Sequence, residues 1–204
     1  MLKWSYGDSG DSIVLESFRH KGYLPEGALD NGNQEESLIA GLPPFLRTLV
    51  VTDGTVTKTL EAYFWEPVIV EPLSQGIKPA DEDIHWLEIE KGNDVLLRNV
   101  RLKGHKTENV YAFASSIVNL NRLPASFRDK LINGDLGIGE LIRDSGLETY
   151  REILEIGACT KNSYSNAKQV DNETPIDMVY RTYRIILNQH PAILITETFP
   201  LSLY

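Results

Sequence analysis

The chain has 204 residues, of which 42% are hydrophobic and 24% are charged, a composition that suits one folded domain and excludes global disorder. Its net charge of -9 argues against a general affinity for nucleic acids or anionic membranes. A site for a small anion is compatible with this charge, because such a site needs only local positive charge.

The first part of the chain predicts an extension followed by a pair of helices. Residues 1–40 are polar and predict an irregular extension, so the folded domain is expected at residues 41–204. Two prolines after Gly41 signal a helix start, and Asp53-Gly54 separates this helix from a second one. Residues 43–64 carry only two basic side chains, so packing on a core is a simpler role for the pair than reading DNA.

Most of the remaining elements are predicted strands. They are residues 67–72, 84–89, 94–102, 110–118, 179–187 and 192–199. The last four form two hairpins, because each pair is joined by a short polar turn. Residues 123–131 predict a short helix, residues 136–142 a loop that leads into a helix, and residues 147–158 either a helix or a strand. A polar, turn-rich stretch follows at residues 160–174. The pattern predicts an α+β fold built on a single antiparallel sheet.

Two predicted strands carry a charge where an apolar side chain is expected. Because side chains alternate between the faces of a strand, Arg98 shares its face with Leu96, Val100 and Leu102. A guanidinium group keeps its proton, so in an apolar setting it needs an anion. Glu197 repeats the anomaly with the opposite sign on the last strand, where its neighbours on the same face are apolar.

Two interpretations of Arg98 and Glu197 follow from the pattern. The two side chains bond each other, or each strand turns its more polar face to water. Alternatively, they share a cavity and hold a ligand with an acid at one end and a hydroxyl at the other. Small residues at Ala112, Ala114 and Ser116 leave room for such a ligand.

Other groups are weaker candidates. Arg181 and Arg184 either add positive potential near a site or lie on a solvated strand face. The Gly137-Ile-Gly139 segment lacks the third glycine of a dinucleotide fingerprint, but its backbone N–H groups could face an anion.

The single cysteine and four scattered histidines exclude a disulfide and a cysteine-rich zinc site, so no metal is expected. No signal peptide or membrane span is visible, and we expect a cytoplasmic protein without membrane contact.

Four segments, in this order, resemble the chorismate lyases (chorismate pyruvate-lyases), including their divergent branch. They are Leu49-Val-Val-Thr-Asp-Gly-Thr-Val-Thr-Lys58, Val95-Leu-Leu-Arg-Asn-Val100, Leu136-Gly-Ile-Gly-Glu-Leu-Ile142 and Ile193-Leu-Ile-Thr-Glu-Thr-Phe-Pro-Leu-Ser-Leu-Tyr204. The last is the most specific, because it combines a strand glutamate with a closing Leu-Tyr. The resemblance covers roughly residues 42–204.

The resemblance implies roles for five residues. Arg98 binds a carboxylate, and Glu197 contacts the region of a ring hydroxyl. Val56 and Ile138 supply backbone or apolar contacts, and Leu97 precedes the arginine in the wall of the site. The family's fold further implies that helices form flaps over an internal ligand cavity.

The implied activity is that of a carbon–oxygen lyase, which eliminates pyruvate from chorismate and leaves 4-hydroxybenzoate. This aromatic acid feeds the synthesis of quinone head groups, either ubiquinone or plastoquinone. The reaction needs no cofactor. The implied partners are the substrate and the aromatic product, with no nucleic acid, and the protein is expected to be a monomer or a weak homo-oligomer.

Two alternatives belong to the class of binding proteins. The run from Leu87 to Arg98 also suits the UTRA domain, a ligand-sensing domain of bacterial transcription regulators whose fold resembles that of the lyase. Those regulators usually carry a DNA-binding module first, and residues 1–40 are too short and too acidic for one. The second alternative is a lyase-like scaffold that binds a small aromatic acid without reacting.

Overall fold

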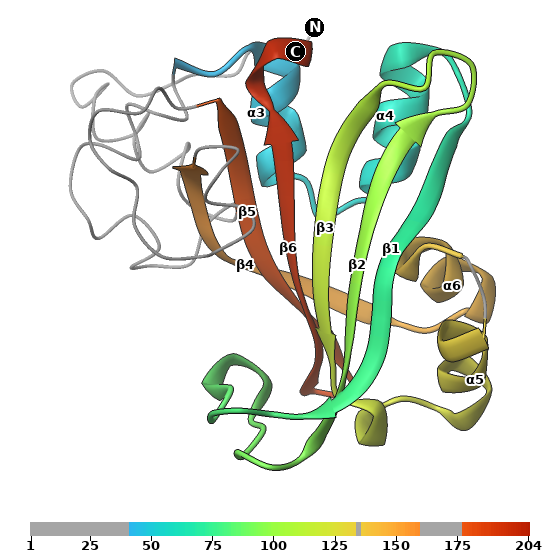
Figure 1. The fold of residues 1–204 in the computed structure, drawn as a ribbon, viewed down its shortest axis with the longest axis vertical. Coiled ribbons are helices and arrows are strands. Elements are labelled where there is room, and N and C mark those ends of the chain that lie inside the picture. The colour runs from blue at the N-terminus through green and yellow to red at the C-terminus, as the bar shows by residue number, and fades with distance from the viewer. Residues whose placement is uncertain (1–40, 134–135, 160–176) are drawn as a thin grey trace, which may run out of the picture.

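Six antiparallel strands form one sheet in the computed structural model, which describes residues 41–133, 136–159 and 177–204 (Figure 1). The order across the sheet is β1-β2-β3-β6-β5-β4. The strands are β1 (Val68–Pro79), β2 (Asp94–Gly104), β3 (Val110–Val118), β4 (Thr149–Cys159), β5 (Met178–Leu187) and β6 (His190–Pro200). The predicted α+β class with a single antiparallel sheet is thereby confirmed.

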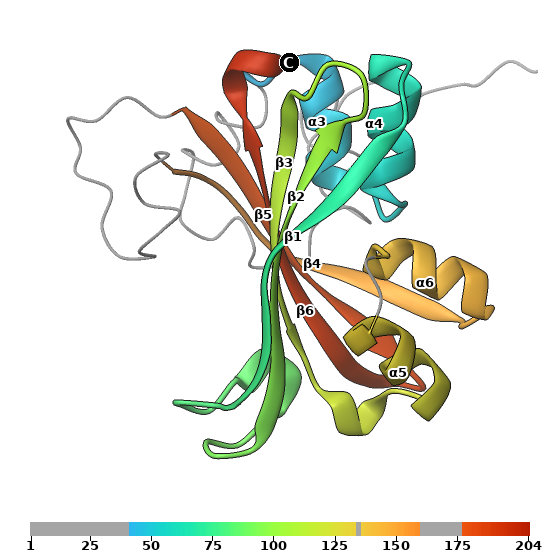
Figure 2. The same cartoon turned by 45° about the vertical axis from the view of Figure 1, so that its right-hand side comes forward.

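Four α-helices and three short 3-10 turns complete the described elements. They are α3 (Pro44–Val51), α4 (Val56–Phe64), α5 (Ala125–Asn133), α6 (Ile138–Ser145), η1 (His85–Leu87), η2 (Leu120–Arg122) and η4 (Leu201–Leu203). The four α-helices lie on the same side of the sheet (Figure 2). Their apolar faces pack against one face of the strands in a single hydrophobic core. Among the described residues, no helix is long and apolar enough to cross a membrane.

The two predicted hairpins are present, and they meet in the middle of the sheet. β2 pairs with β3, β5 pairs with β6, and β3 then pairs with β6. β4 occupies the far edge beside β5, so the ambiguous segment at residues 147–158 is a strand. The segment at residues 123–131 is helical in α5, and the loop predicted at residue 136 leads into α6.

Two predictions for the stretch before β2 are wrong. β1 continues to Pro79, beyond the strand predicted at residues 67–72, because this edge strand pairs with β2 on both sides of an irregularity at Pro72/Ser74. An edge strand tolerates exposed polar residues and proline. The strand predicted at residues 84–89 is instead the 3-10 turn η1, closed by a single bridge between Ile84 and Ile89. The predictions for residues 1–40 and 160–174 fall outside the described residues.

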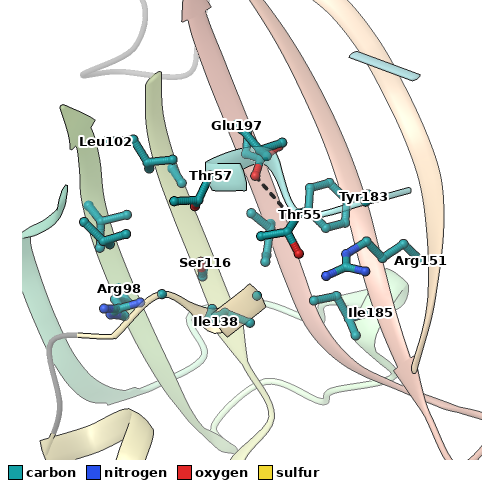
Figure 3. Close-up of a pocket in the computed structure, with 18 residues that line it drawn as sticks. Thr55, Thr57, Arg98, Leu102, Ser116, Ile138, Arg151, Tyr183, Ile185 and Glu197 are labelled. Carbon is teal, nitrogen blue, oxygen red and sulfur yellow. Dashed lines mark hydrogen bonds between the residues drawn. The ribbon is translucent and has the colours of Figure 1, made fainter. Parts of the chain in front are cut away.

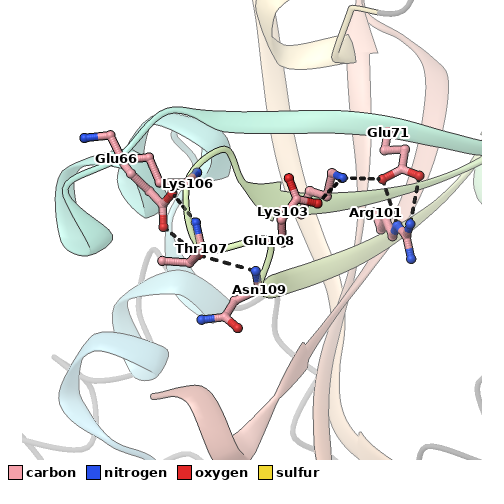
Figure 4. Close-up of polar contacts among 8 residues, drawn as sticks. All are labelled: Glu66, Glu71, Arg101, Lys103, Lys106, Thr107, Glu108 and Asn109. Carbon is pink, nitrogen blue, oxygen red and sulfur yellow. Dashed lines mark hydrogen bonds and ion pairs between the residues drawn. The ribbon is translucent and has the colours of Figure 1, made fainter.

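A buried carboxylate fastens the end of α4 to the turn between β2 and β3. Glu66 is buried and accepts hydrogen bonds from the backbone N–H of Lys106 at 2.6 Å and of Thr107 at 3.2 Å (Figure 4). The hydroxyls of Thr107 and Tyr111 also donate to it. A Cβ at Gly104 would lie 2.5 Å from Glu66 Oε1, so only glycine fits beside this network.

The outer face of the sheet near this turn carries a partly exposed group of ion pairs. Arg101 donates to Glu71 from Nε at 3.0 Å and from Nη2 at 2.8 Å (Figure 4). Lys103 adds a contact of 3.3 Å to the same carboxylate. Arg101 therefore faces away from Arg98, as strand alternation predicts.

Glu66 makes the stability of the fold depend on acid pH. The hydrogen bond from Tyr111 and those from Thr107 and Lys106 lower the pKa of Glu66 to about 2, from an ordinary value of 4.5. A folded-state pKa below the unfolded one stabilises the fold above the unfolded value, and this contribution is lost as the pH falls from about 4.5 to about 2. We expect Glu66→Gln to be less stable than the wild type at pH 7, with a difference that shrinks as the pH falls through this range. Urea unfolding at several pH values measures the difference, and one that stayed constant would contradict the role of Glu66.

Candidate functional site

A cavity lies between the covered face of the sheet and the starts of two helices (Figure 3). Its wall on the sheet side comes from side chains on all six strands, including Arg98, Ser116 and Glu197. Its cover comes from the α3–α4 turn at residues 54–57 and from the start of α6 at residues 137–139, and we call these two segments the flaps. The cavity volume is about 60 Å³. Because ligand pockets begin at roughly 300 Å³, a ring compound enters only if the flaps or their side chains move.

Arg98 is buried at the wall formed by β2, with 2% of its surface exposed. Its Nη2 atom donates a hydrogen bond of 2.9 Å to the backbone oxygen of Leu136, just before α6. Opposite it on β3 lies Ser116, one of the small residues that were expected to leave room. The strand face that carries Arg98 is therefore the covered one, and an interpretation in which this face meets water is wrong.

Glu197 lies two strands away and has a different partner. In the register Glu197 is opposite Ala114 of β3, which in turn is opposite Val100 of β2. Arg98 lies two residues before Val100, so about 12 Å separate the backbones of Arg98 and Glu197. Oε2 of Glu197 accepts a hydrogen bond of 2.8 Å from Nε of Arg181. The alternative in which Arg98 and Glu197 bond each other is therefore wrong, and both side chains line the same cavity.

Arg181 and Tyr183 each donate a hydrogen bond to the carboxylate of Glu197. Only 8% of Glu197 and 1% of Arg181 is exposed, so the ion pair is buried. Burial and the neighbouring Glu197 raise the pKa of Tyr183, whose hydroxyl therefore stays protonated and donates to Oε1 at 3.1 Å (Figure 3). Burial alone would lower the pKa of Arg181, but Glu197 and Tyr183 outweigh it and the pKa is raised.

Arginines on the sheet also hold the flaps in place. Nη1 of Arg181 donates to the backbone oxygen of Thr52, and Nη1 of Arg151 donates to that of Asp53 at 2.9 Å. These two bonds fix the α3–α4 turn, as the bond from Arg98 to Leu136 fixes the approach to α6. Each guanidinium group thus connects one strand to one covering segment.

Two helices begin at the flaps, so their first turns lie beside the cavity. Val56 is the first residue of α4 and Ile138 is the first residue of α6, and both are buried. Neither Thr55 nor Gly137, the N-cap residues, makes a side-chain capping bond. The first N–H groups of a helix lack partners within the helix and carry partial positive charge, so they favour an anion.

Four of the five residues expected from the sequence line the cavity, namely Val56, Arg98, Ile138 and Glu197. The fifth, Leu97, does not: its side chain packs against a second, smaller core on the other side of the sheet with Leu87 and Val95. Strand alternation requires this placement, because Leu97 directly precedes Arg98.

Sequence reasoning missed the partner of Glu197 and one arginine of the wall. Arg181 is buried on the cavity side, whereas Arg184 points to the opposite face and pairs with Glu152 at 2.7 Å, so the two arginines do not form a set. The missed signal was the same as for Arg98: Arg181 interrupts an otherwise apolar alternation along β5. Arg151 was missed because its segment fitted two kinds of element.

The described residues hold no group of three His, Cys, Asp or Glu side chains that could bind a metal ion. The charged side chains of the cavity wall are two arginines and one glutamate, a set that suits an organic anion with a hydroxyl group.

Comparison with known proteins identifies relatives of most of the described domain. The model of the Rv2949c-like chorismate pyruvate-lyase family matches residues 50–204. The chorismate pyruvate-lyase of Mycobacterium leprae is 31% identical over 163 residues, which cover 78% of this chain and 75% of that protein. The Mycobacterium tuberculosis enzyme of the same name is 28% identical over 168 residues, with 78% and 81% covered.

Solved structures agree on the fold. The effector domain of PhnF from Mycobacterium smegmatis superposes with a TM-score of 0.53 at 14% identity, over 74% of this chain and 90% of that domain. At this identity the likeness shows the fold alone. The resemblance to the lyases that the sequence shows is confirmed, and the resemblance to domains of transcription regulators is confirmed for the fold.

The buried ion pair predicts a large and specific effect on stability. We expect Arg181→Met to lower the free energy of unfolding by about 3–5 kcal/mol, because it leaves the carboxylate of Glu197 buried without a cation. The double variant Arg181→Met/Glu197→Leu should recover much of this loss. Arg184→Met, which removes a more exposed pair, should cost about 1 kcal/mol or less. Urea denaturation measures all three, and equal losses for Arg181→Met and Arg184→Met would contradict the assignment.

Proposed function

This chain belongs to the Rv2949c-like chorismate pyruvate-lyase family, and we propose that it cleaves chorismate into pyruvate and 4-hydroxybenzoate. The observation that carries the proposal is a covered cavity with a guanidinium group at one wall and a carboxylate acceptor at another. The ring of chorismate carries a carboxylate and, across from it, a hydroxyl. Arg98 and Glu197 offer the matching partners.

In this proposal Arg98 binds the ring carboxylate. The carboxylate takes the place of the Leu136 backbone oxygen on Nη2, and the first N–H groups of α6 at Ile138 add hydrogen bonds. Entry of the substrate therefore exchanges a contact that holds a flap for a contact that holds the ligand. The same exchange in reverse accompanies release of the aromatic product.

Glu197 accepts the hydrogen bond of the ring hydroxyl. Arg181 and Tyr183 already direct N–H and O–H groups to its two oxygens, which keeps the carboxylate fixed in position. The start of α4 at Val56 closes the cavity above this end of the ring. Together these groups set the orientation of the ring before the reaction begins.

The chemistry requires orientation more than added reagents. The C–H bond of the hydroxyl-bearing carbon breaks, the hydrogen goes to the methylene carbon of the enolpyruvyl group, and the ether bond to the ring breaks. The released group is pyruvate, and the new double bond makes the ring aromatic. The reaction is redox-neutral, so no electron carrier is needed. The protein lowers the barrier by folding the side chain over the ring and by matching the charges.

The alternative is a domain that binds an aromatic acid without converting it. The PhnF effector domain has the same fold, which is compatible with that alternative, but at 14% identity the likeness concerns the fold alone. As a lyase in the cytoplasm, the protein would supply 4-hydroxybenzoate for quinone head groups, either ubiquinone or plastoquinone. Release of pyruvate separates the two functions.

The direct test is turnover of chorismate by the purified full chain. We expect pyruvate and 4-hydroxybenzoate in equal amounts without added metal or nucleotide. Pyruvate is measured by coupling to lactate dehydrogenase, and the aromatic acid by chromatography. Pyruvate release no faster than the spontaneous decay of chorismate would overturn the lyase assignment and leave the binding alternative.

A matched pair of arginine variants tests whether Arg98 contacts the ring carboxylate. Arg98→Ala should lower kcat/KM for chorismate at least 100-fold, about 3 kcal/mol, because a charge-assisted contact to the ring carboxylate is lost. Arg101→Ala, three residues along β2 on the outer face, should stay within about threefold of the wild type. Steady-state kinetics with circular dichroism as the folding control decides the test. Equal losses in the two variants would mean that Arg98 does not contact the substrate.

A further inference from the structure

Arg151 is a second guanidinium group in the cavity, on the wall opposite Arg98 (Figure 3). It comes from β4, the far edge of the sheet, whereas Arg98 comes from β2. In the register Arg151 is opposite Ile185, which also lines the cavity, so its side chain leaves the sheet on the covered face.

We propose that Arg151 binds the carboxylate of the enolpyruvyl side chain and so forms a second anion subsite. This inference rests on the proposed lyase function for the identity of the ligand. It assigns to Arg151 a substrate-binding role that neither Arg98 nor Glu197 can fill.

The balance of charges supports a second subsite. Chorismate carries two carboxylates, one on the ring and one on the side chain. Of the described residues that line the cavity, the charged ones are Arg98, Arg151 and Glu197. The charge of Glu197 is met by Arg181 at 2.8 Å. The wall therefore presents two guanidinium groups for the two carboxylates of the substrate.

The positions of the groups also match. In chorismate the side chain leaves the ring at the carbon next to the hydroxyl-bearing one, so it must emerge near Glu197 and away from the ring carboxylate. The wall beyond Glu197 is formed by Tyr183 and Ile185 of β5 and then by Arg151 (Figure 3). A side chain that leaves the ring at this point is directed towards β4.

The existing contact of Arg151 is compatible with this role. Its Nη1 atom donates to the backbone oxygen of Asp53, in the turn that leads into α4. A guanidinium group has five N–H donors, and this contact uses one of them. A carboxylate on the same group would connect the substrate side chain to the flap that covers it.

The subsite would distinguish substrate from product. Once pyruvate has left, 4-hydroxybenzoate retains the groups that Arg98 and Glu197 bind but has no side-chain carboxylate. Arg151 thus adds affinity for the substrate without adding affinity for the product, which limits inhibition by the product.

Two inert ligands test the proposal with the full chain. The first is 4-hydroxybenzoate, and the second is 3-(carboxymethoxy)-4-hydroxybenzoate, which carries an extra carboxylate on an ether at the position of the substrate side chain. In Arg151→Ala we expect the Kd of the dicarboxylate to rise roughly 10- to 100-fold, as the loss of a charge-assisted hydrogen bond requires. The Kd of 4-hydroxybenzoate should change less than about threefold. Isothermal titration calorimetry measures both.

Two controls accompany this comparison. Arg184→Ala, on the opposite face of the sheet, should leave both Kd values unchanged. Arg151→Lys keeps the charge but not the fork of donors, so it should restore part of the affinity for the dicarboxylate. Equal weakening of both ligands in Arg151→Ala would mean that Arg151 only positions the flap, and no weakening of either would mean that it meets no ligand. Either result overturns the proposal. A selective loss in a protein that releases no pyruvate would keep the subsite and overturn the lyase function alone.

Discussion

A guanidinium group that is taken out of water must find oxygen acceptors, because it cannot give up its proton. The covered face of this sheet carries two such groups, Arg98 and Arg181, and a third, partly exposed one, Arg151, and each of the three donates to the backbone of a covering segment. Arg181 has the carboxylate of Glu197 as well. The arrangement of the sheet, the flaps and the cavity depends on how these three groups are satisfied.

This dependence connects the fold to the chemistry. A backbone carbonyl is a weaker acceptor for a guanidinium group than a carboxylate is. A dianionic substrate can therefore replace carbonyl contacts at Arg98 and Arg151, whereas Arg181, already paired with Glu197, stays in its structural role. The bonds that close the site are therefore the same bonds that the ligand replaces. This explains both why the cavity is small and why the flaps can open for a ligand.

The sequence was most informative where the alternation of side chains was regular. The two hairpins followed from period-two patterns, and the same patterns singled out Arg98 and Glu197 as one misplaced charge each, while they left open whether these strand faces are buried. The partner of Glu197 could not be read from the sequence, because the pairing of β5 with β6 and the register that places Arg181 opposite Glu197 depend on contacts across the sheet. The same alternation that placed Arg98 correctly excludes the side chain of Leu97 from the cavity.

Other errors had local causes. β1 extends through a polar stretch because hydrogen bonding to β2 outweighs its weak strand propensity. Conversely, the apolar residues at positions 84–89 form a turn, since Leu87 is buried in the smaller core instead of pairing in the sheet. Arg151 was assigned to the cavity only by the three-dimensional structure, because its segment fitted either a helix or a strand and the face of its side chain could not be read from the sequence.

The central claim is that Arg98 and Glu197 hold the two ends of one aromatic acid inside the cavity. A crystal structure of the complex with 4-hydroxybenzoate tests it most directly. We expect the carboxylate within hydrogen-bond distance of the Arg98 guanidinium group, the hydroxyl on Glu197, and the Leu136 carbonyl displaced from Nη2. A ring bound outside the cavity, or bound with its carboxylate away from Arg98, would contradict the account.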